Sequence, residues 1–519
     1  MARSILRKFP IGVQSFKKIR DNQFLYVDKT ALVYELANSG GSYFLSRPRR
    51  FGKSLLISTF EAYFKGQKEL FEGLAIEQLE KDWITYPVLH IDLNAEKFDA
   101  PEQLDALLSN QLTQWEEIYG KGEDETTLSL RFKGVIRRAA EQTGHPAVVL
   151  VDEYDKPLLQ SLHKEALHSA YKDTLKAFYG VLKSADQYLR FYLLTGVTKF
   201  SQVSVFSDLN QLNDISMDKR YNEICGLTWQ EIADNFEPEL KELAEDNDLT
   251  PEETRETMTR LYDGYHFMFG QEGIFNPFSV LNVLDRSQFD NYWFKTGTPT
   301  FLVELLKKTD YDLRDIDGVQ MAVDGFADYR ADVQRPIPVI YQSGYLTIKD
   351  YDKEFRLYTL GFPNEEVKYG FLSFIAPFYT AIPSTESPFY ISRFVIELES
   401  GDVDAFMERL RAFFADIPYE LNDKSERHYQ AVFYLVFKLM GQFTEAEVRS
   451  ARGRADAVVK TRDYIYVFEF KLDGTVEEAL RQIDDKGYLI PYQSDGRQLI
   501  KVGANFSAEE RNIENWTSQ

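Results

Sequence analysis

Gly52-Lys53-Ser54 is a short run whose residue types can bind the phosphate groups of a nucleotide. The aromatic and aliphatic segment 41–46 before it predicts a buried strand, and the apolar residues of segment 55–64 recur at helical spacing. A strand, a loop and a helix in this order form a P-loop. Backbone N–H groups and the helix N-terminus hold phosphate oxygens there, while the lysine reaches the outer phosphates and the serine ligates Mg²⁺. We therefore predict that Gly52, Lys53 and Ser54 bind a nucleotide and that Ser54 also binds the metal.

The loop departs from the usual pattern at its beginning. That pattern has a glycine five residues before Gly52, and Arg47 occupies the position here. The ring of Pro48 stiffens the loop, and Arg47, Arg49 and Arg50 make it cationic, so guanidinium groups are predicted to meet part of the phosphate charge. We expect such a loop to bind a nucleotide tightly and to turn it over slowly, as a switch does.

A second motif of the nucleotide site follows the buried strand 146–151 and consists of Asp152 and Glu153. Asp152 would hold magnesium through water, and Glu153 would polarise the attacking water. Each motif alone has an ordinary alternative, since Gly-Lys-Ser runs occur by chance and an Asp-Glu pair after a strand often caps a helix. In this order and on these elements, the two motifs predict an ATPase-type core that takes ATP and Mg²⁺.

The next buried strand, 190–196, provides a further candidate. Thr195 lies at its tip, where a polar residue commonly senses the outermost phosphate of the nucleotide. Lys199 or Arg220 would supply a positive charge near that phosphate, from this chain or from a neighbouring copy. The alternative is that Thr195 and Arg220 are ordinary loop residues.

The last hundred residues contain a second constellation of charged side chains. Asp456 begins a strand, and Glu469 and Lys471 lie two residues apart on the next strand, so they share one face of the sheet. In a hairpin of this length Asp456 lies opposite Glu469. Two carboxylates on one face are ligands for Mg²⁺ or Mn²⁺, and Lys471 would orient a metal-activated water or offset charge on a scissile phosphate. This is the Asp…Glu-x-Lys arrangement of PD-(D/E)XK nucleases.

Other residues extend this second site. Glu426 on the preceding helix is a candidate third metal ligand, and the following helix carries Gln482 and Tyr488. The order helix, strand, strand, strand, helix, strand resembles the PD-(D/E)XK core and implies an α/β restriction-endonuclease-like domain. Glu445 and Glu447 lie on the first of these strands and are interpreted as surface carboxylates, with metal binding as the alternative.

The elements that must position these residues predict an α/β fold. Near-continuous apolar strands alternate with helices over the first 225 residues, which predicts a parallel sheet of the P-loop NTPase type. A length of 519 residues predicts several domains. We divide the chain into a P-loop domain (1–225), a helix-rich, lid-like region (226–330), a mixed connector (331–420) with short strands at 339–341 and 356–360, and a nuclease-like domain (421–519).

Charge and composition limit the function classes. The net charge of −22 argues against nucleic acid as a partner, but residues 1–60 hold eleven Lys/Arg and three Asp/Glu, and residues 421–519 hold fourteen and sixteen. The single cysteine, Cys225, excludes an internal disulfide and a cysteine-rich zinc site, and it fits a reducing cytoplasm. No apolar run approaches membrane-spanning length, and the first residues are too charged for a signal peptide. We expect a cytoplasmic protein without membrane contact.

Four stretches make the chain resemble the AAA-ATPase-like family of bacterial proteins. In that family an N-terminal ATPase-like domain is commonly joined to a C-terminal nuclease-like domain of the PD-(D/E)XK superfamily. Arg47 in place of the first glycine is itself a feature of the family, so it is not a defect of this chain. Segments 262–265 and 275–279 resemble the family's middle region. The four stretches are Tyr26–Thr30, Arg47–Leu55, Val151–Pro157 and Thr195–Phe200.

The two predicted sites together indicate an ATP-binding, metal-dependent nuclease, in which the N-terminal domain gates or moves the C-terminal one. Nucleic acid, with DNA expected ahead of RNA, would be the substrate, and the subunits could form a homo-oligomer. The alternative is a nucleotide-dependent switch whose nuclease-like domain is inactive and only binds nucleic acid or a protein partner. A third interpretation is a degenerate scaffold that hydrolyses nothing.

Overall fold

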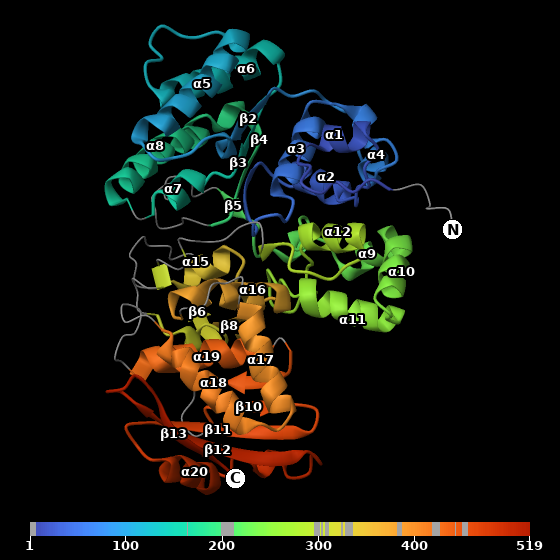
Figure 1. The fold of residues 1–519 in the computed structure, drawn as a ribbon. Coiled ribbons are helices and arrows are strands. Elements are labelled where there is room, and N and C mark those ends of the chain that lie inside the picture. The colour runs from blue at the N-terminus through green and yellow to red at the C-terminus, as the bar shows by residue number, and fades with distance from the viewer. Residues whose placement is uncertain are drawn as a thin grey trace. The chain divides into compact units, whose positions relative to one another are not determined.

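The fold is known from a computed structural model, shown in Figure 1. The structure describes residues 7–162, 164–198, 212–294, 302, 305–306, 311–322, 325–326, 336–380, 387–417, 426–441, 443–448 and 455–519. The chain forms two compact units. The first comprises Met1–Trp293 and Gln320–Asn364, and the second comprises Phe294–Val319 and Glu365–Gln519, so the chain passes between them three times. The four predicted segments are a different division of the chain and stay a prediction.

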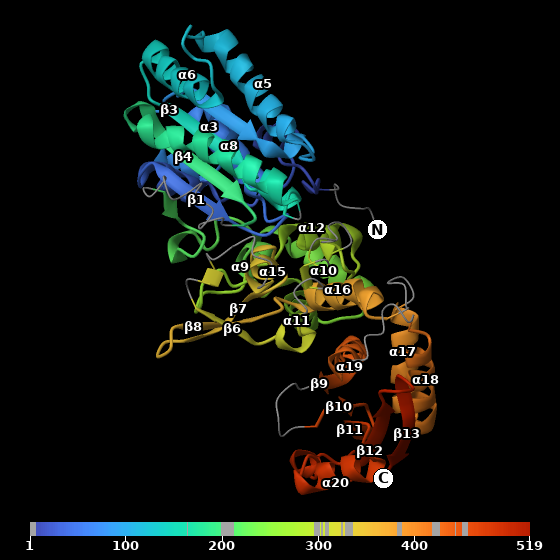
Figure 2. The ribbon, with the colours of Figure 1, turned by 90° about the vertical axis from the view of Figure 1, so that its left-hand side faces the viewer.

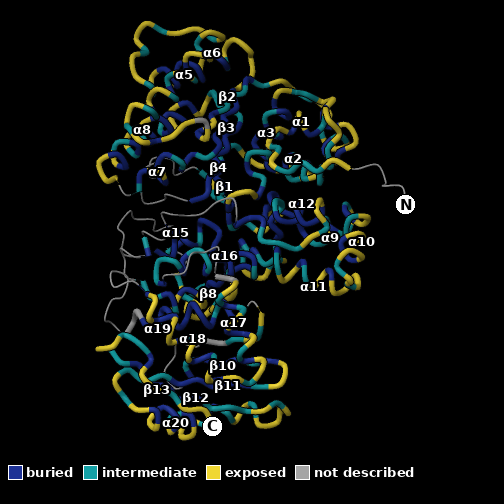
Figure 3. Tube along the Cα trace, in the orientation of Figure 1, coloured by how far each residue is buried: buried dark blue, intermediate teal, exposed yellow. Residues whose placement is uncertain are grey.

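A five-stranded parallel sheet forms the core of the first unit, as predicted. Every residue of the strand Ala147–Asp152 is buried, and Figure 3 shows this strand and its neighbour Leu189–Gly196 largely in the buried colour. Helix α3 (Lys53–Phe64) packs on one face, and α7 (Lys156–Gln160) and α8 (Glu165–Ser184) lie on the other (Figure 1). In spatial order the strands are β2 (Val88–Asp92), β3 (Ala147–Asp152), β4 (Leu189–Gly196), β1 (Ser42–Ser46) and β5 (Asn213–Asp214).

The strand order decides which motifs can meet. Because β4 lies between β1 and β3, the tip of β4 separates the loop after β1 from the Asp-Glu pair after β3. Parallel strands bring all three carboxyl ends to one edge of the sheet. The remaining elements of this region are α1 (Phe16–Asp21), α2 (Thr30–Asn38), η1 (Lys68–Phe71), α4 (Ala75–Leu79), η2 (Leu93–Ala95), α5 (Pro101–Tyr119), α6 (Leu128–Thr143), η3 (Asp186–Tyr188) and η4 (Lys219–Tyr221).

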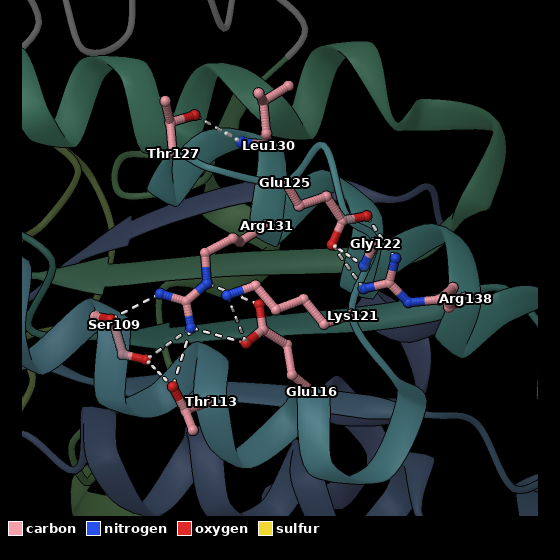
Figure 4. Close-up of polar contacts among 10 residues, drawn as sticks. All are labelled: Ser109, Thr113, Glu116, Lys121, Gly122, Glu125, Thr127, Leu130, Arg131 and Arg138. Carbon is pink, nitrogen blue, oxygen red and sulfur yellow. Dashed lines mark hydrogen bonds and ion pairs between the residues drawn. The ribbon is translucent and has the colours of Figure 1, made fainter.

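Helices α5 and α6 form a hairpin that half-buried ion pairs hold together (Figure 4). The guanidinium of Arg131 on α6 donates to the Glu116 carboxylate on α5 at 2.7 and 2.8 Å, and it also bonds Ser109 and Thr113. Gly134 leaves room for the Glu125 carboxylate, because a Cβ atom at Gly134 would lie 1.8 Å from Glu125 Oε1. The hairpin therefore presents a fixed outer layer to the sheet.

The middle of the chain adds a helical subdomain and a small sheet to the first unit. The helices α9 (Trp229–Asn235), α10 (Glu237–Asp246), α11 (Pro251–Tyr262) and α12 (Pro277–Arg286) share one apolar core. The small sheet has the order β6 (Val319–Ala322), β8 (Leu357–Gly361) and β7 (Thr347–Asp352). The strand predicted at 356–360 is confirmed as β8.

The strand predicted at 339–341 is wrong, since these residues lie in helix α15 (Ile337–Gln342). Their branched and aromatic side chains favour a strand, but Pro338 in the first helical turn favours a helix start. Ile337, Val339 and Ile340 are all buried, so packing decides the local structure.

The second unit is built on a mixed five-stranded sheet in the order β13-β12-β11-β10-β9, with β11 and β12 parallel and the other pairs antiparallel. Figures 1 and 2 show α20 on one face and α17, α18 and α19 on the other. The predicted order of helix, three strands, helix and strand is confirmed. The elements are η6 (Leu313–Asp315), α16 (Glu365–Ile375), η7 (Ala376–Phe378), α17 (Ser387–Glu399), α18 (Val403–Ala415), α19 (Glu426–Met440), β9 (Glu445–Val448), β10 (Ala457–Lys460), β11 (Tyr464–Leu472), α20 (Val476–Asp485), η8 (Ile490–Tyr492), β12 (Gln498–Ser507) and β13 (Asn512–Ser518).

In the part of the chain that the structure describes, no helix combines the length and the apolar character needed to span a bilayer.

Candidate functional site

The loop between β1 and α3 closes around its own lysine. Gly52 precedes α3 with φ of 95°, a left-handed conformation that glycine adopts without a steric penalty. Lys53, the first residue of α3, is 4% exposed, and its Nζ atom donates to the carbonyl oxygens of Arg47 at 3.0 Å and Pro48 at 3.1 Å. Ser54 follows on the same turn and is half-buried. The predicted phosphate ligands Gly52, Lys53 and Ser54 thus lie at the N-terminus of one helix.

Arg47 is enclosed by the protein. Its guanidinium donates to the carbonyl oxygens of Ser46 at 2.9 Å, Ser216 at 2.8 Å and Tyr221 at 3.1 Å, and it lies 3.9 Å from the centre of the Phe267 ring. Burial lowers the pKa of Arg47 to about 10, so the side chain stays charged at neutral pH. These contacts give Arg47 a role in the fold of the loop. Its predicted contact with phosphate stays a prediction.

Arg49 and Arg50 are exposed, in contrast to Arg47. Arg50 has φ of 67°, which is unfavourable for a residue other than glycine, and its guanidinium lies 3.9 Å from the centre of the Phe278 ring. Burial of part of this side chain lowers the pKa of Arg50. The carbonyl of Arg49 accepts a 3.1 Å hydrogen bond from Trp293 Nε1. Both arginines thus lie on a loop whose backbone and side chains contact the middle of the chain.

Pro48 and Phe51 complete these contacts. Gly344 approaches Pro48 so closely that a Cβ atom at Gly344 would lie 2.5 Å from Pro48 Cβ. The Phe51 ring packs edge-on against Tyr265 at 4.8 Å between centres, and the Phe51 carbonyl accepts a 3.1 Å hydrogen bond from Gly226 N. Every residue from Arg47 to Phe51 therefore contacts a segment beyond residue 215 of the same unit.

Asp152 and Thr195 meet at the predicted position beside this loop. Asp152 is 4% exposed at the end of β3, and its Oδ1 atom accepts hydrogen bonds from Thr195 Oγ1 at 2.7 Å and from Glu153 N at 3.0 Å. Glu153 has φ of 50°, a strained conformation of the kind that clusters at functional sites. Burial raises the pKa of Glu153, and the nearby Lys53 opposes part of that rise.

Asp155 locks the two strand tips together, and sequence reasoning missed it. Its buried carboxylate accepts hydrogen bonds from Val197 N at 3.0 Å and from Thr198 N and Oγ1 at 2.6 and 2.7 Å. Burial raises the pKa of Asp155, and the Thr198 bonds oppose the rise. Tyr154 Oη adds a 2.8 Å bond to the Thr198 carbonyl. The signal available in the sequence was the position of Asp155, an acidic residue three positions after the aspartate that ends the strand.

Arg220 and Lys199 are the two cations predicted near the outermost phosphate. Arg220 is exposed and forms a two-atom ion pair with Asp218, whose closest distance is 2.7 Å. Lys199 lies outside the described residues. A contact between either residue and the outermost phosphate stays a prediction.

An apolar cavity of about 110 Å³ adjoins Gly52 on the side of the middle region. Apolar side chains line it from three parts of the first unit: the N-terminal segment, the start of α3, and the α9 to α12 region. An ion pair between Lys29 and Glu231 joins the first and third of these parts. The lining includes Leu25, Val27, Leu55, Leu227, Phe236 and Leu281.

The second site lies at the edge where β10 meets β11. Ala457 pairs with Phe468, and one further step of this register sets Asp456 opposite Glu469. Asp456 Oδ2 accepts a 2.8 Å hydrogen bond from Phe470 N. Lys471 Nζ donates to Glu469 Oε1 at 2.9 Å, so the structure brings the three predicted residues together.

Glu469 is the most constrained group of this site. The residue is 2% exposed, and its Oε2 atom has no hydrogen-bond partner. Burial and the neighbouring charge of Asp456 raise the pKa of Glu469 to about 7, while Lys471 opposes the rise. A buried carboxylate oxygen without a partner is costly unless a cation or a proton occupies its position.

The remaining predicted residues of this site have mixed outcomes. Gln482 Oε1 on α20 accepts a 2.6 Å hydrogen bond from Lys471 Nζ, and Gln482 Nε2 lies 3.4 Å from Tyr488 Oη. Glu426 is the first residue of α19, but its side chain lies outside the described part, as does that of Glu447. Glu445 is exposed and forms an ion pair with Lys460.

A pocket of about 240 Å³ opens over these residues. Its polar lining includes Arg314, Asp456, Glu469 and Lys471, and aromatic rings of α19, β11 and β12 form much of the rest. Two carboxylates with an orphaned oxygen suit a hard divalent cation, which prefers oxygen ligands and retains several waters. Among the described residues no group of three or more His, Cys, Asp or Glu side chains could hold a metal. The described residues therefore fit Mg²⁺ or Mn²⁺ through two carboxylates and water.

Comparison with known proteins gives matches at both ends of the chain. Residues 10–206 match the sequence profile described as Predicted AAA-ATPase, and residues 424–516 match the profile of the PD-(D/E)XK nuclease superfamily. A protein of Azotobacter chroococcum mcd 1, described as an uncharacterized protein in the vnfD 5′ region, is 35% identical over 520 residues. The match covers 98% of each chain.

Among solved structures, the ORC2 protein of Aeropyrum pernix in ADPNP and ADP complexes is 11% identical to this chain. The match covers 70% of this chain and 92% of that one, with a TM-score of 0.17. A TM-score this low does not show a shared fold.

Proposed function

The chain belongs to the AAA-ATPase-like family and carries a C-terminal domain of the PD-(D/E)XK nuclease superfamily, and on that premise we propose that it is an ATP-controlled, metal-dependent nuclease. The proposal has two parts, since each site can be tested without the other. One observation carries the nuclease part. It is the buried, unpartnered Glu469 oxygen next to Asp456, with Lys471 bonded to the same carboxylate.

At the nucleotide site, phosphate oxygens would replace the carbonyl oxygens that now accept from Lys53. The N–H groups at the start of α3 would hold the same phosphates. Ser54 and Asp152 would hold Mg²⁺, which offsets phosphate charge when it is bound. Glu153 would accept a hydrogen bond from the attacking water. Burial raises the pKa of Glu153, which favours proton uptake from that water.

The apolar cavity beside Gly52 would take the base of the nucleotide. It lies next to the phosphate loop, and its lining matches the flat, apolar faces of an adenine ring. Because the lining comes from three separate segments, a bound base would hold the N-terminal segment and the α9 to α12 helices against α3.

At the nuclease-like site, Asp456 and Glu469 would bind Mg²⁺ or Mn²⁺, which when bound lowers the pKa of a coordinated water. Lys471 would hold a substrate phosphate oxygen or the attacking water. Hydrolysis adds the water oxygen to phosphorus, breaks the bond from phosphorus to the leaving oxygen, and gives that oxygen a proton. Gln482 keeps the Lys471 ammonium on this face through its 2.6 Å bond.

The direct test incubates the full-length protein with plasmid, linear and single-stranded DNA and with RNA, each with Mg²⁺ or Mn²⁺ and with or without ATP. We expect cleavage by wild type and its loss in Asp456→Asn and Lys471→Ala. Lys460→Ala is the matched control, because Lys460 lies on the adjacent strand and pairs with the exposed Glu445. Equal cleavage by wild type and the first two variants would reject the nuclease assignment.

The ATP dependence is tested in the same assay. Lys53→Ala should abolish ATP binding and leave any cleavage at its ATP-free rate. Glu153→Gln should keep ATP binding and slow phosphate release. If neither substitution changes phosphate release, the result favours the third interpretation, a scaffold that hydrolyses nothing.

A nucleotide-dependent switch with an inactive nuclease-like domain is the second candidate function. It is favoured by the small number of metal ligands, since the described residues offer only two carboxylates at this site. Calorimetry separates the two. Absence of Mn²⁺ binding at the C-terminal site, with ATP binding intact, would select the switch.

A further inference from the structure

One residue of the nuclease-like pocket comes from outside the region that matches the nuclease superfamily. Arg314 lines the pocket together with Asp456, Glu469 and Lys471, whereas every other lining residue falls within residues 424–516. It lies in the short helix η6, in the segment Phe294–Val319 that belongs to the second unit.

The turn that carries Arg314 is anchored in the second unit. Leu313 is 1% exposed and Ile316 is fully buried, and η6 packs against α19, the helix that lines the aromatic side of the pocket. Burial raises the pKa of Tyr434 on α19, and the aspartates of this segment raise it further. An apolar anchor of this kind holds the backbone of the turn at one place beside the pocket.

The Arg314 side chain is oriented by a neighbouring carboxylate. Asp312 caps η6 by accepting from Arg314 N at 3.0 Å, and the same carboxylate accepts from Arg314 Nε at 2.9 Å and Nη2 at 2.6 Å. This pair fixes the plane of the guanidinium, so less conformational entropy is lost when a further oxygen ligand binds. The side chain is 24% exposed, so it is accessible from the pocket.

We propose that Arg314 binds a phosphate of the nucleic acid substrate at this pocket and positions it against Asp456, Glu469 and Lys471. The inference rests on the proposed nuclease function. A planar guanidinium recognises two phosphate oxygens at once, and Arg314 lines the same pocket as Asp456, Glu469 and Lys471. Arg314 would therefore bind the phosphodiester beside Lys471, and it contributes to the site from a segment that precedes the superfamily domain.

The chain offers a matched control. Arg497 forms the same pair with the aspartate two residues before it, since Arg497 Nε and Nη2 donate to Asp495 at 2.5 and 2.8 Å. Its side chain is 25% exposed, close to the value for Arg314, and it does not line the pocket. Arg314→Gln and Arg497→Gln each remove an ion pair with the aspartate two residues before the arginine, and only Arg314 lines the pocket.

The experiment compares wild type, Arg314→Gln, Arg314→Lys and Arg497→Gln as full-length proteins. Binding of a labelled single-stranded oligonucleotide is measured in Ca²⁺ and in EDTA at several salt concentrations, and cleavage is measured in Mn²⁺. We expect Arg314→Gln to weaken binding roughly 10- to 100-fold and to reduce the salt slope by about one. Arg314→Lys should recover part of the affinity, and Arg497→Gln should bind like wild type.

The outcomes separate this inference from the proposed function. Wild type that binds without cutting, with weaker binding in Arg314→Gln, supports Arg314 and rejects the nuclease activity. Wild type that cuts, with unchanged KM, kcat and salt slope in Arg314→Gln, rejects Arg314 alone. A change in Mn²⁺ affinity without a change in oligonucleotide affinity also rejects it, because Arg314 would then act on the carboxylates. Wild type that neither binds nor cuts any nucleic acid overturns both.

Discussion

Thr195 Oγ1 donates a 2.7 Å hydrogen bond to Asp152 Oδ1, which ties the tip of β4 to the tip of β3. Thr195 is fully buried and Asp152 is 4% exposed, so bulk water does not replace this bond. Because β4 lies between β1 and β3, the hydroxyl holds the proposed magnesium carboxylate from the strand adjacent to the P-loop strand. Thr195, which we predict to sense phosphate, thus orients the Asp152 carboxylate that we propose as a magnesium ligand.

Thr195→Val should slow ATP hydrolysis roughly 10-fold, which corresponds to the loss of one buried hydrogen bond of about 1.4 kcal/mol. ATP affinity should change less, because Lys53 and the α3 N-terminus stay in place. Phosphate release and calorimetric ATP binding measure the two effects. Thr195→Ser keeps the hydroxyl and should hydrolyse at nearly the wild-type rate. A Thr195→Val protein with wild-type hydrolysis would contradict this role.

Arg47→Ala should destabilise the first unit in the absence of nucleotide by about 3 kcal/mol or more, because three carbonyl oxygens lose a buried charged donor. Thermal unfolding of the nucleotide-free protein checks this. Arg49→Ala is the control, since Arg49 is exposed and should change the unfolding temperature little. An Arg47→Ala protein with normal stability and lost ATP binding would instead place this arginine at the phosphates.

Gly344→Ala should weaken ATP binding by displacing Pro48 in the P-loop. Gly344 has φ of +87°, and a Cβ atom there would lie 2.5 Å from Pro48 Cβ. Gly270→Ala has a comparable conformational cost, with φ of +79°, but nothing lies within 4 Å of its Cβ position. Both variants should lose about 1 kcal/mol of stability from the backbone conformation alone, and the contact with Pro48 adds to that loss in Gly344→Ala. Only Gly344→Ala should lose ATP affinity, and equal affinities would show that the loop tolerates the contact.

Glu469 predicts a pH dependence of stability for the metal-free protein. Its pKa rises from 4.5 to about 7 on folding, so between these values the folded state binds more protons than the unfolded state. Stability from this group is therefore present at acidic pH and decreases as the pH rises through 7. Glu469→Gln should raise the unfolding temperature in EDTA at pH 8 and change it little at pH 5.

Metal binding should act in the opposite direction, since it requires the deprotonated carboxylate. Mn²⁺ should raise the unfolding temperature of wild type more at pH 8 than at pH 6, and it should have no such effect on Glu469→Gln. Calorimetric scans with and without Mn²⁺ measure this. An equal effect of Mn²⁺ on wild type and Glu469→Gln would place the metal elsewhere.

The local sequence was sufficient to predict those elements and motifs whose residues are neighbours in the chain. The all-apolar strand β3, the Gly52-Lys53-Ser54 run and the Glu-x-Lys spacing each depend on neighbours in the chain, and the structure has them on the expected elements. The placement of Asp456 opposite Glu469, one step beyond the paired residues Ala457 and Phe468, also followed from the hairpin length.

Long-range partners were not accessible in this way. Two of the three carbonyl groups around Arg47 come from positions about 170 residues away, and Arg314 lines a pocket formed mainly after residue 424. Nothing in the local pattern of Ser216, Tyr221 or Arg314 distinguishes them from surface loop residues. The helix at 337–342 was missed for a related reason, since burial overrode the strand preference of its side chains.

The discontinuous composition of the two units affects how the gene can be cut or recombined. A fragment that begins at residue 421 would carry the sheet β9 to β13 but lack η6, Arg314 and the helices α16 to α18, which belong to the same compact unit. A fragment that ends there would contain those helices without their sheet. Neither unit is encoded by one uninterrupted stretch of DNA, so neither can be exchanged as a single cassette.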